Sequence, residues 1–278
     1  MTAFLSAVSR LFDGLFYPFR ALSPWLPLVL FSFLAGILML LVFRFTSNQP
    51  AIRRVKDRMQ AHLLEVRLFP DQLSVVLRAY GRILRWTLAY LAHALVPLAV
   101  MTVPLVLLLV QMDFRFGHHP LRPRDSFLLK VLAAGDATLE NVALSLPEGL
   151  AATAPALNIA QPPNNQHEVN WRVAAQRAGE FSVFVTVAGQ TFEKQVIVVE
   201  PDATVRLSPA RVRPGWFEWL LESSEPPLPS GSPVHHILVV YPHRSLALGR
   251  WELHWLVPFL VFSLVAAFAL KGVFRTEF

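Results

Sequence analysis

Three long apolar stretches divide the sequence. Residues 21–43, 86–112 and 255–270 carry no charged side chain over 23, 27 and 16 positions. A helix needs about 20 apolar residues to cross the hydrocarbon core of a bilayer. The first two stretches reach that length, and the third reaches it if Lys271 extends its side chain back to the membrane surface. The pattern therefore predicts transmembrane helices at 21–43, 86–112 and 251–272.

Helical periodicity also marks the segments that flank the first apolar stretch. In residues 1–20 apolar side chains cluster at helical spacing, which predicts an amphipathic helix in the membrane interface. Chance clustering in an apolar-rich chain explains that pattern equally well. Apolar residues recur at spacings of three and four over 52–66 and again over 73–84, with Pro70 between the two series. Residues 44–85 are therefore predicted to form an antiparallel helical hairpin outside the bilayer.

After residue 112 the pattern becomes strand-like. Turn residues separate five short segments, at 127–132, 139–146, 168–173, 180–187 and 191–199. A further strand is expected at 236–241, and an aromatic segment at 216–221 is expected to lie on the membrane interface. Short strands with frequent turns are typical of an immunoglobulin-like sandwich, here without the Cys…Trp…Cys pattern of antibody domains. Residues 113–250 are predicted to form such a β-sandwich with an interfacial tail, giving a membrane protein of the α + β class.

The distribution of charge adds sidedness to this picture. Residues 44–85 hold nine Lys or Arg and three Asp or Glu, so their net charge of +6 equals that of the whole chain. Residues 112–253 hold twelve basic and fourteen acidic side chains. Because short basic loops stay in the cytoplasm, the hairpin should lie inside, with the sandwich and the N-terminus outside and a cytoplasmic tail at 273–278. The composition, 54% hydrophobic and without cysteine, favours a multi-pass protein of a bacterial inner membrane.

The sequence offers little for covalent chemistry. It lacks the GxSxG, HExxH, GxxxxGK[ST] and GxGxxG motifs, so we expect no enzyme activity, no cofactor and no metal. The absence of cysteine excludes disulfides and cysteine-ligated zinc. The adjacent histidines at 118–119 and 235–236 would point to opposite faces of a strand, so neither pair can chelate a metal alone. Asp113, Arg115 and the charged residues up to Asp125 are interpreted as a solvated cluster beside the membrane.

Three polar side chains are the candidate lining of an intramembrane groove. Arg44 ends the first stretch between apolar neighbours, and an ionisable residue at membrane depth points to function, although a helix-end arginine also anchors by reaching the interface. His93 and Gln111 fall on one face of the second stretch, together with Pro97 and Pro104, which can kink a helix. This face either packs against the other helices or lines a hydrated groove.

Basic residues of the hairpin are the candidate surface for a partner or the ribosome: Arg53, Arg54, Lys56, Arg58 and Arg67. In one interpretation they hold the hairpin inside and bind lipid headgroups. In another they contact RNA, such as ribosomal RNA. Aromatic residues are not interleaved with them, so we expect neither sequence-specific nucleic-acid reading nor DNA binding.

The order of these parts resembles the YidC/Oxa/Alb membrane insertase superfamily, most of all its minimal three-helix members, such as the archaeal homologues and the related subunit of the ER membrane complex. The likeness covers residues 4–112 and, more loosely, the last apolar stretch. It rests on the interfacial helix, Arg44 followed by Asn48-Gln49-Pro50, the basic hairpin, and the proline-containing second stretch. In that family an intramembrane arginine sits in a hydrated groove open to the cytoplasm, and the hairpin contacts substrate or ribosome. Bacterial members usually have five core spans, and an inserted sandwich is not typical of them.

The resemblance implies an insertase-like or chaperone-like membrane protein, with Arg44 at the position of the family arginine. A cationic, wet groove would lower the cost of moving polar segments through hydrocarbon. The expected partners are membrane lipids and nascent membrane proteins or the ribosome. The alternative is a non-catalytic structural subunit that binds other membrane subunits through its sandwich. The long external domain and the lack of deeply placed charge favour that alternative.

Overall fold

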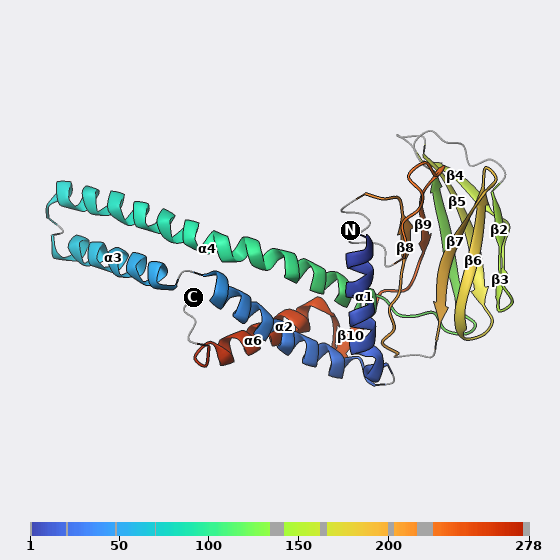
Figure 1. The fold of residues 1–278 in the computed structure, drawn as a ribbon, viewed down its shortest axis with the longest axis horizontal. Coiled ribbons are helices and arrows are strands. Elements are labelled where there is room, and N and C mark those ends of the chain that lie inside the picture. Colours follow the sequence, from blue (N-terminus) through green and yellow to red (C-terminus); the bar gives the residue numbers. More distant parts are fainter. Residues whose placement is uncertain are drawn as a thin grey trace. The chain divides into compact units, whose positions relative to one another are not determined.

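The computed structural model describes residues 2–20, 22–47, 49–69, 71–133, 142–161, 166–199, 203–215 and 225–274. They form an α+β structure of long apolar helices and antiparallel β-sheets (Figure 1). The chain folds as two compact units. We call Met1–Leu28 with Leu109–Leu256 the β unit, and Val29–Leu108 with Val257–Phe278 the helical unit.

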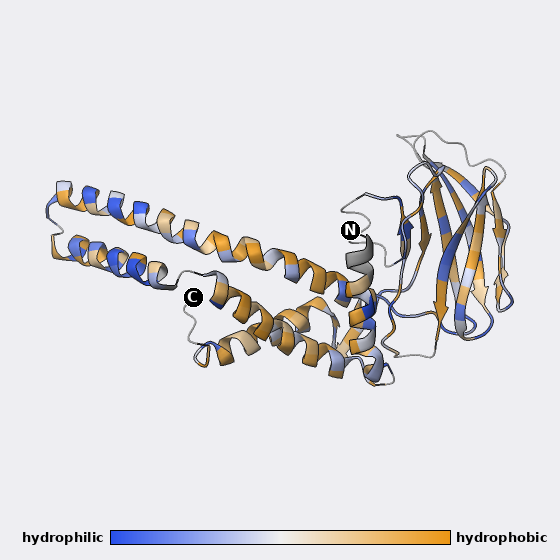
Figure 2. Ribbon diagram, in the orientation of Figure 1, coloured by the Kyte–Doolittle hydropathy of each residue, from blue (hydrophilic) through white to orange (hydrophobic). Residues whose placement is uncertain are grey.

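The first two apolar stretches form helices long enough to cross a membrane. Helices α2 (Trp25–Thr46) and α4 (Leu73–Phe116) have 22 and 44 residues, and both are apolar over most of their length (Figure 2). Helix α6 (Leu256–Leu270) is equally apolar but has 15 residues. At 1.5 Å per residue it measures about 22 Å, against a hydrocarbon core of about 30 Å. Two helices therefore meet the length of a span, and a third crossing at α6 stays a prediction.

The helix of the third predicted span, 251–272, begins later than the sequence predicted. Trp251–His254, which was assigned to the span at 251–272, is instead strand β11 and pairs with β10 (Ser245–Leu248). Gly249 has φ +64°, a left-handed conformation that suits the two-residue turn between these strands. The alternation of apolar and polar residues in Trp-Glu-Leu-His has the period of a strand. The predicted start of the third span is therefore wrong.

Helix α3 (Gln49–Leu68) and the first part of α4 form the helical hairpin predicted for residues 44–85. Glu65 of α3 accepts a hydrogen bond from Arg82 of α4 at 3.3 Å, and the Arg58 guanidinium lies 4.5 Å from the centre of the Trp86 ring. These pairs run in opposite directions along the two helices, as an antiparallel hairpin requires. Helix α4 continues through Pro97 and Pro104. The second helix of the predicted hairpin and the second apolar stretch are therefore one helix.

Two antiparallel sheets share the core of the β unit. The larger sheet has the order β3 (Leu150–Ala152), β5 (Gln166–Ala175), β1 (Ser126–Ala133), β9 (Val234–Val239), β8 (Ala210–Val212), and β4 (Leu157–Gln161) also pairs with β5. The smaller sheet has the order β2 (Ala143–Ser145), β6 (Gly179–Val187), β7 (Gln190–Val198). Val131, Trp171, Val185 and Val196 are among the buried residues that both sheets contribute. The immunoglobulin-like type of this arrangement stays a prediction.

Each segment predicted from alternation contains a strand. Strands β1, β5, β6, β7 and β9 lie at the predicted positions within a few residues. The segment predicted at 139–146 is a strand at Ala143–Ser145, and residues 139–141, like the aromatic segment at 216–221, lie outside the described residues. Strands β3, β4 and β8 were not predicted, because three to five residues are too few for a clear alternation.

Candidate functional site

The N-terminal helix α1 (Thr2–Phe16) packs on the end of α4 within the β unit. Arg115 of α4 is the centre of this contact: its side chain is 1% exposed and donates to Asp13 Oδ1 at 2.5 Å. The guanidinium also lies 4.9 Å from the centre of the Phe16 ring. The interpretation of Arg115 as a solvated residue was wrong, because α1 covers it. The sequence carries no local signal for this pairing, since Asp13 and Arg115 are 102 positions apart.

Residues 203–208 form a short extended segment of the β unit, which we call the neck. Its Arg206 lies 3.0 Å from Asp13 Oδ2, and its Thr204 N–H donates to the Arg20 carbonyl at 3.4 Å, just after the 3₁₀ turn η1 (Tyr17–Phe19). The Leu207 N–H donates to the Phe114 carbonyl of α4 at 2.7 Å. Arg244, which precedes β10, donates to the Ala203 carbonyl at 2.9 Å.

The neck thereby holds three chain segments that adjoin the apolar helices. These are the residues before α2, the last turn of α4 and the residue before β10, which leads to α6. Trp255, directly before α6, is also fixed, because its indole N–H donates to Asp113 Oδ1 on α4 at 3.1 Å. The β unit therefore gathers one end of each apolar helix beside the sheets.

The three predicted groove residues occupy different surroundings. Gln111 is buried and donates to Ser9 Oγ at 3.2 Å, so it belongs to the contact between α1 and α4. Arg44, in the last turn of α2, and His93, on α4, are both exposed in the helical unit. His93 and Gln111 are separated by 18 positions, about 27 Å along a helix. Within the described ranges, no hydrogen bond or ion pair joins any two of these three residues.

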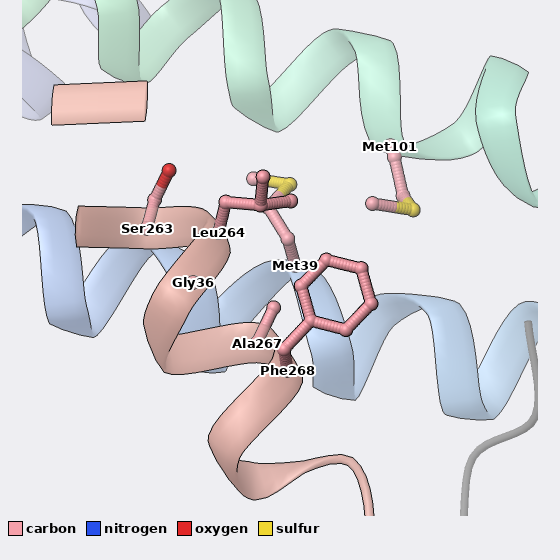
Figure 3. A pocket seen from close by; sticks show the side chains of 7 residues that line it. All are labelled: Gly36, Met39, Met101, Ser263, Leu264, Ala267 and Phe268. Carbon is pink, nitrogen blue, oxygen red and sulfur yellow. The ribbon is translucent and has the colours of Figure 1, made fainter. Parts of the chain in front are cut away.

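An apolar pocket lies in the helical unit between α2, α4 and α6 (Figure 3). Its volume is about 390 Å³, and its lining consists of Gly36, Met39, Met101, Ser263, Leu264, Ala267 and Phe268. The helices α2 and α6 approach closely at Gly36, where an added Cβ atom would lie 2.3 Å from the Ser263 carbonyl oxygen. Small residues permit such close crossings between apolar helices. The hydrophobic pattern of the sequence does not predict this pocket, and the local signals for it are Gly36 and the small residues of α6.

The basic residues of the α3–α4 hairpin divide into two groups. Arg53, Arg54 and Arg67 are exposed, and Arg54 donates to the Pro50 carbonyl at 3.2 Å. Lys56 and Arg58 lie over aromatic rings of α4, with the Lys56 ammonium 5.8 Å from the centre of the Tyr90 ring. Exposed apolar residues surround the turn of the hairpin, among them Leu68, Phe69, Leu73 and Leu77. This end of the hairpin therefore presents both guanidinium groups and apolar side chains.

The histidines do not assemble into a metal site in the part of the chain that the structure describes, where no group of three or more His, Asp or Glu side chains is arranged to hold an ion. The rings of His118 and His243 face each other at a centroid distance of 5.0 Å, across a β-bridge between these residues. Burial lowers the pKa of His118, which the nearby Asp113 carboxylate opposes. His235 and His236 contact each other through their Nδ1 atoms at 3.3 Å.

A second buried cation lies in the β unit. The Lys194 ammonium on β7 is fully buried, donates to the Ser208 carbonyl at 2.6 Å and forms a salt bridge with Glu225. Burial lowers the pKa of Lys194, and the Glu225 carboxylate opposes that shift. This pair also was not predicted, because the two residues lie 31 positions apart. Its role is structural: it fastens residues 208 and 225 to the edge of the smaller sheet.

No family model, no curated protein and no solved structure matches this chain. The resemblance to the YidC/Oxa/Alb superfamily therefore stays a prediction from the order of the parts.

Proposed function

We propose that this protein is a membrane protein of three spans, α2, α4 and α6, that assists the insertion or assembly of other membrane proteins. Its apolar pocket would receive part of an incoming apolar helix. The basic hairpin would lie in the cytoplasm, and the N-terminus and an immunoglobulin-like sandwich would lie outside a bacterial inner membrane. The observation that carries the proposal is the pocket between the three apolar helices.

The contacts of the neck support the arrangement of the spans. Three helices that cross a bilayer in alternating directions must place the start of the first, the end of the second and the start of the third on one side. The β unit holds these three ends. The exposed side chains of Leu11 on α1 and Tyr17 on η1, at 66% and 69% exposure, suit the interface at that side.

The shape and chemistry of the pocket support a role in receiving apolar segments. A volume of about 390 Å³ lies within the range of about 300–1,000 Å³ for ligand pockets. Met39 and Met101 have unbranched, adaptable side chains that can pack against varied apolar surfaces. The shortness of α6 would thin the bilayer beside the pocket and reduce the distance that a client has to cross.

Arg44 and His93 retain a role in this proposal as residues at the route to the pocket, with Arg44 at the cytoplasmic end of α2. An exposed guanidinium there would attract acidic residues that flank a client helix. The hairpin residues Arg53, Arg54 and Arg67 would provide the first contact with nascent chains, the ribosome or anionic lipid. No covalent step is required for this function.

Site-specific photocrosslinking tests the proposal. A photoreactive amino acid at Met101, which lines the pocket, should crosslink to nascent membrane proteins in translating vesicles. The same amino acid at Val103, which is 64% exposed on the same helix, serves as the matched control and should crosslink mainly to lipid. Replacing Ala267 with Phe should fill the pocket and reduce the crosslink from position 101. Equal crosslinking from positions 101 and 103 would reject a receiving pocket.

The second candidate function, a structural subunit that binds a partner outside, is favoured by the open edge of the larger sheet. Leu157 on β4 is 60% exposed, and exposed edge strands readily pair with another chain. A photoreactive amino acid at position 157 that trapped one defined membrane subunit, with no client crosslinks from position 101, would favour this candidate.

A further inference from the structure

The hairpin β10–β11 is amphipathic. Leu248 pairs with Trp251 beside the turn, and Leu246 pairs with Leu253 one step further from it. Because side chains alternate between the two faces of a strand, these four apolar residues share one face. The other face carries Ala247 paired with Glu252, and Ser245 paired with His254. The hairpin thus has one apolar face although it has only four residues in each strand.

The apolar face is buried at the base of the hairpin and exposed to solvent at its end. Leu246 is 4% exposed, whereas Leu248 and Trp251 are 58% and 72% exposed. The base of the hairpin is therefore held by packing, and its end presents a tryptophan and a leucine side by side. Exposed apolar area costs about 25 cal/mol per Å², so a covering surface at this end would stabilise the structure.

The position of the hairpin in the chain identifies that surface. Strand β11 ends at His254 and α6 begins at Leu256, so the hairpin adjoins the point where the third apolar helix enters the bilayer. At its other end, the Arg244 N–H donates to the Gly117 carbonyl at 3.0 Å, directly after the end of α4. The hairpin is therefore attached on both sides to residues at helix ends. Tryptophan and arginine are the residues that membrane interfaces favour at such positions.

The length of α6 is a second, independent reason to place the hairpin at the membrane surface. The helix falls short of the hydrocarbon core by about 8 Å, the difference between about 22 Å and about 30 Å. A four-residue strand measures about 13 Å at about 3.3 Å per residue. A helix this short thins the bilayer around it, so the headgroup level at the start of α6 lies within reach of the hairpin.

We propose that residues 248–251 insert into the outer interface of the bilayer, with the Trp251 ring at the level of the headgroups and Arg250 among the lipid phosphates. The hairpin lies in the interface and not in the hydrocarbon core, because within the described residues β10 and β11 pair only with each other and their outer edges need water. The third crossing thus consists of α6, with the β-hairpin in the interface at its outer end. This inference rests on the proposed crossing of α2, α4 and α6 but not on any insertion activity.

Fluorescent labelling tests this proposal in the full chain. The protein has no cysteine, so a single introduced cysteine carries one environment-sensitive fluorophore at a known position. Leu248→Cys is the test position, and Glu252→Cys, on the opposite face of the hairpin, is the matched control. Gln190→Cys, at the exposed start of β7 beside the turn from β6, reports exposure to water. The proteins are reconstituted into phosphatidylcholine and phosphatidylglycerol vesicles.

We expect the emission from position 248 to shift to shorter wavelength. Lipids with a quencher near the headgroup should quench it several-fold more than they quench the emission from positions 252 and 190. Quenching by aqueous iodide should follow the opposite order. Iodide quenching at position 248 equal to that at position 190 would overturn the proposal. A blue shift at 248 without lipid quenching would also overturn it, because a second copy or another protein would then cover the face.

A label at Leu98→Cys separates this inference from its premise. Leu98 is 59% exposed on α4 and should be quenched by lipids that carry the quencher deep in the acyl chains. If position 98 is quenched and position 248 is not, the inference on the hairpin fails and the spanning helices stand. If neither is quenched, the membrane crossing itself fails.

Discussion

At the scale of residues, the buried cations Arg115 and Lys194 make two of the contacts that the sequence did not reveal. Arg115 and Lys194 are 1% and 0% exposed, and each meets a carboxylate far away in sequence. Burying a charge is expensive unless a partner compensates for the lost hydration, and removal of one partner leaves the other charge in a medium of low dielectric constant. Substitutions at these pairs should therefore have large effects on stability.

Asp13→Asn should destabilise the contact between α1 and α4. We expect a loss of roughly 2–3 kcal/mol, below the ~3–5 kcal/mol for a fully buried pair, because the Asp13 side chain is 29% exposed. Thermal unfolding of the detergent-solubilised protein, followed by tryptophan fluorescence, measures the effect. Asp57→Asn, on the exposed surface of α3, makes the same change in charge and should leave the unfolding temperature nearly unchanged. Equal effects of the two substitutions would contradict the role of Asp13.

Lys194 should make stability depend on pH in the alkaline range. Burial lowers its pKa in the folded protein below the ordinary 10.5, so between the two values the unfolded chain binds more protons. The free energy of unfolding should therefore rise with pH in that window. Lys194→Met should remove the rise in denaturant titrations at stepped pH. Lys130→Met, at a partly exposed ion pair with Glu168, should retain it. An unchanged slope in Lys194→Met would refute this assignment.

At the scale of elements, two features decide which surfaces another chain can contact. They are the close approach of neighbouring helices and the protection of the edge strands of the sheets. In the second half of β7, an edge strand, outward N–H groups find acceptors: Gln195 donates to Glu225 and Ile197 to the Tyr241 hydroxyl, and Val199, directly after the strand, donates to the Leu121 carbonyl. These bonds protect the second half of the β7 edge from pairing with another chain. The edge at β4 has no comparable cover among the described contacts, so it is one edge at which a partner strand could bind.

Tyr241→Phe tests the protection of this edge. The substitution removes the acceptor for the Ile197 N–H, at 3.1 Å, and leaves a buried donor without its partner. We expect a loss of about 1–3 kcal/mol of stability and faster hydrogen exchange at Ile197. Tyr80→Phe, at an exposed position of α4, is the control and should change neither quantity. Unchanged exchange at Ile197 would show that the hydroxyl does not protect the strand.

Gly36→Ala tests the crossing of α2 and α6. Its Cβ atom would lie 2.3 Å from the Ser263 carbonyl oxygen, so the helices must separate. Overpacking of this kind costs about 1–3 kcal/mol and should lower the unfolding temperature of the helical unit. Gly81→Ala, where the added Cβ meets nothing within 4 Å, should instead stabilise α4 by up to about 1 kcal/mol. A neutral Gly36→Ala would indicate that the two helices do not pack as described.

At the scale of the whole molecule, the proposed topology places the basic hairpin and the sandwich on opposite sides of one membrane. The charge of +6 on residues 44–85 and the near-neutral charge of residues 112–253 are its basis in sequence. The collection of three helix ends in the β unit is its basis in structure. Both features belong to the chain as a whole and not to any single motif.

Cysteine labelling in intact cells tests this topology. Gln60→Cys reports the α3 side of the hairpin, and Glu148→Cys reports an exposed turn of the β unit. A membrane-impermeant maleimide applied to cells with a permeable outer envelope should label position 148 at once and position 60 only after lysis. The reverse order, or labelling of both positions before lysis, would reject the topology. The parent chain, without cysteine, provides the background signal.

The sequence by itself determined the elements of this protein. The apolar stretches predicted α2 and α4, spacings of three and four predicted the hairpin of α3 and α4, and alternation predicted β1, β5, β6, β7 and β9. These predictions succeed because burial on one face imposes a local period, and that period can be read from neighbouring residues. They lose accuracy where an element is short, as at β3 and β8, or where an apolar strand precedes an apolar helix, as at Trp251–His254.

Only the tertiary structure decided which residues meet. It paired Arg115 with Asp13, assigned Gln111 to the contact with α1, and formed the pocket from residues of three helices. It also left Arg44 and His93 exposed and unconnected to each other among the described contacts. Such contacts depend on packing between segments far apart in the sequence, as with the separation of 102 between Asp13 and Arg115. No local period records them, because the free energy that selects a buried partner arises only when the distant surfaces come together.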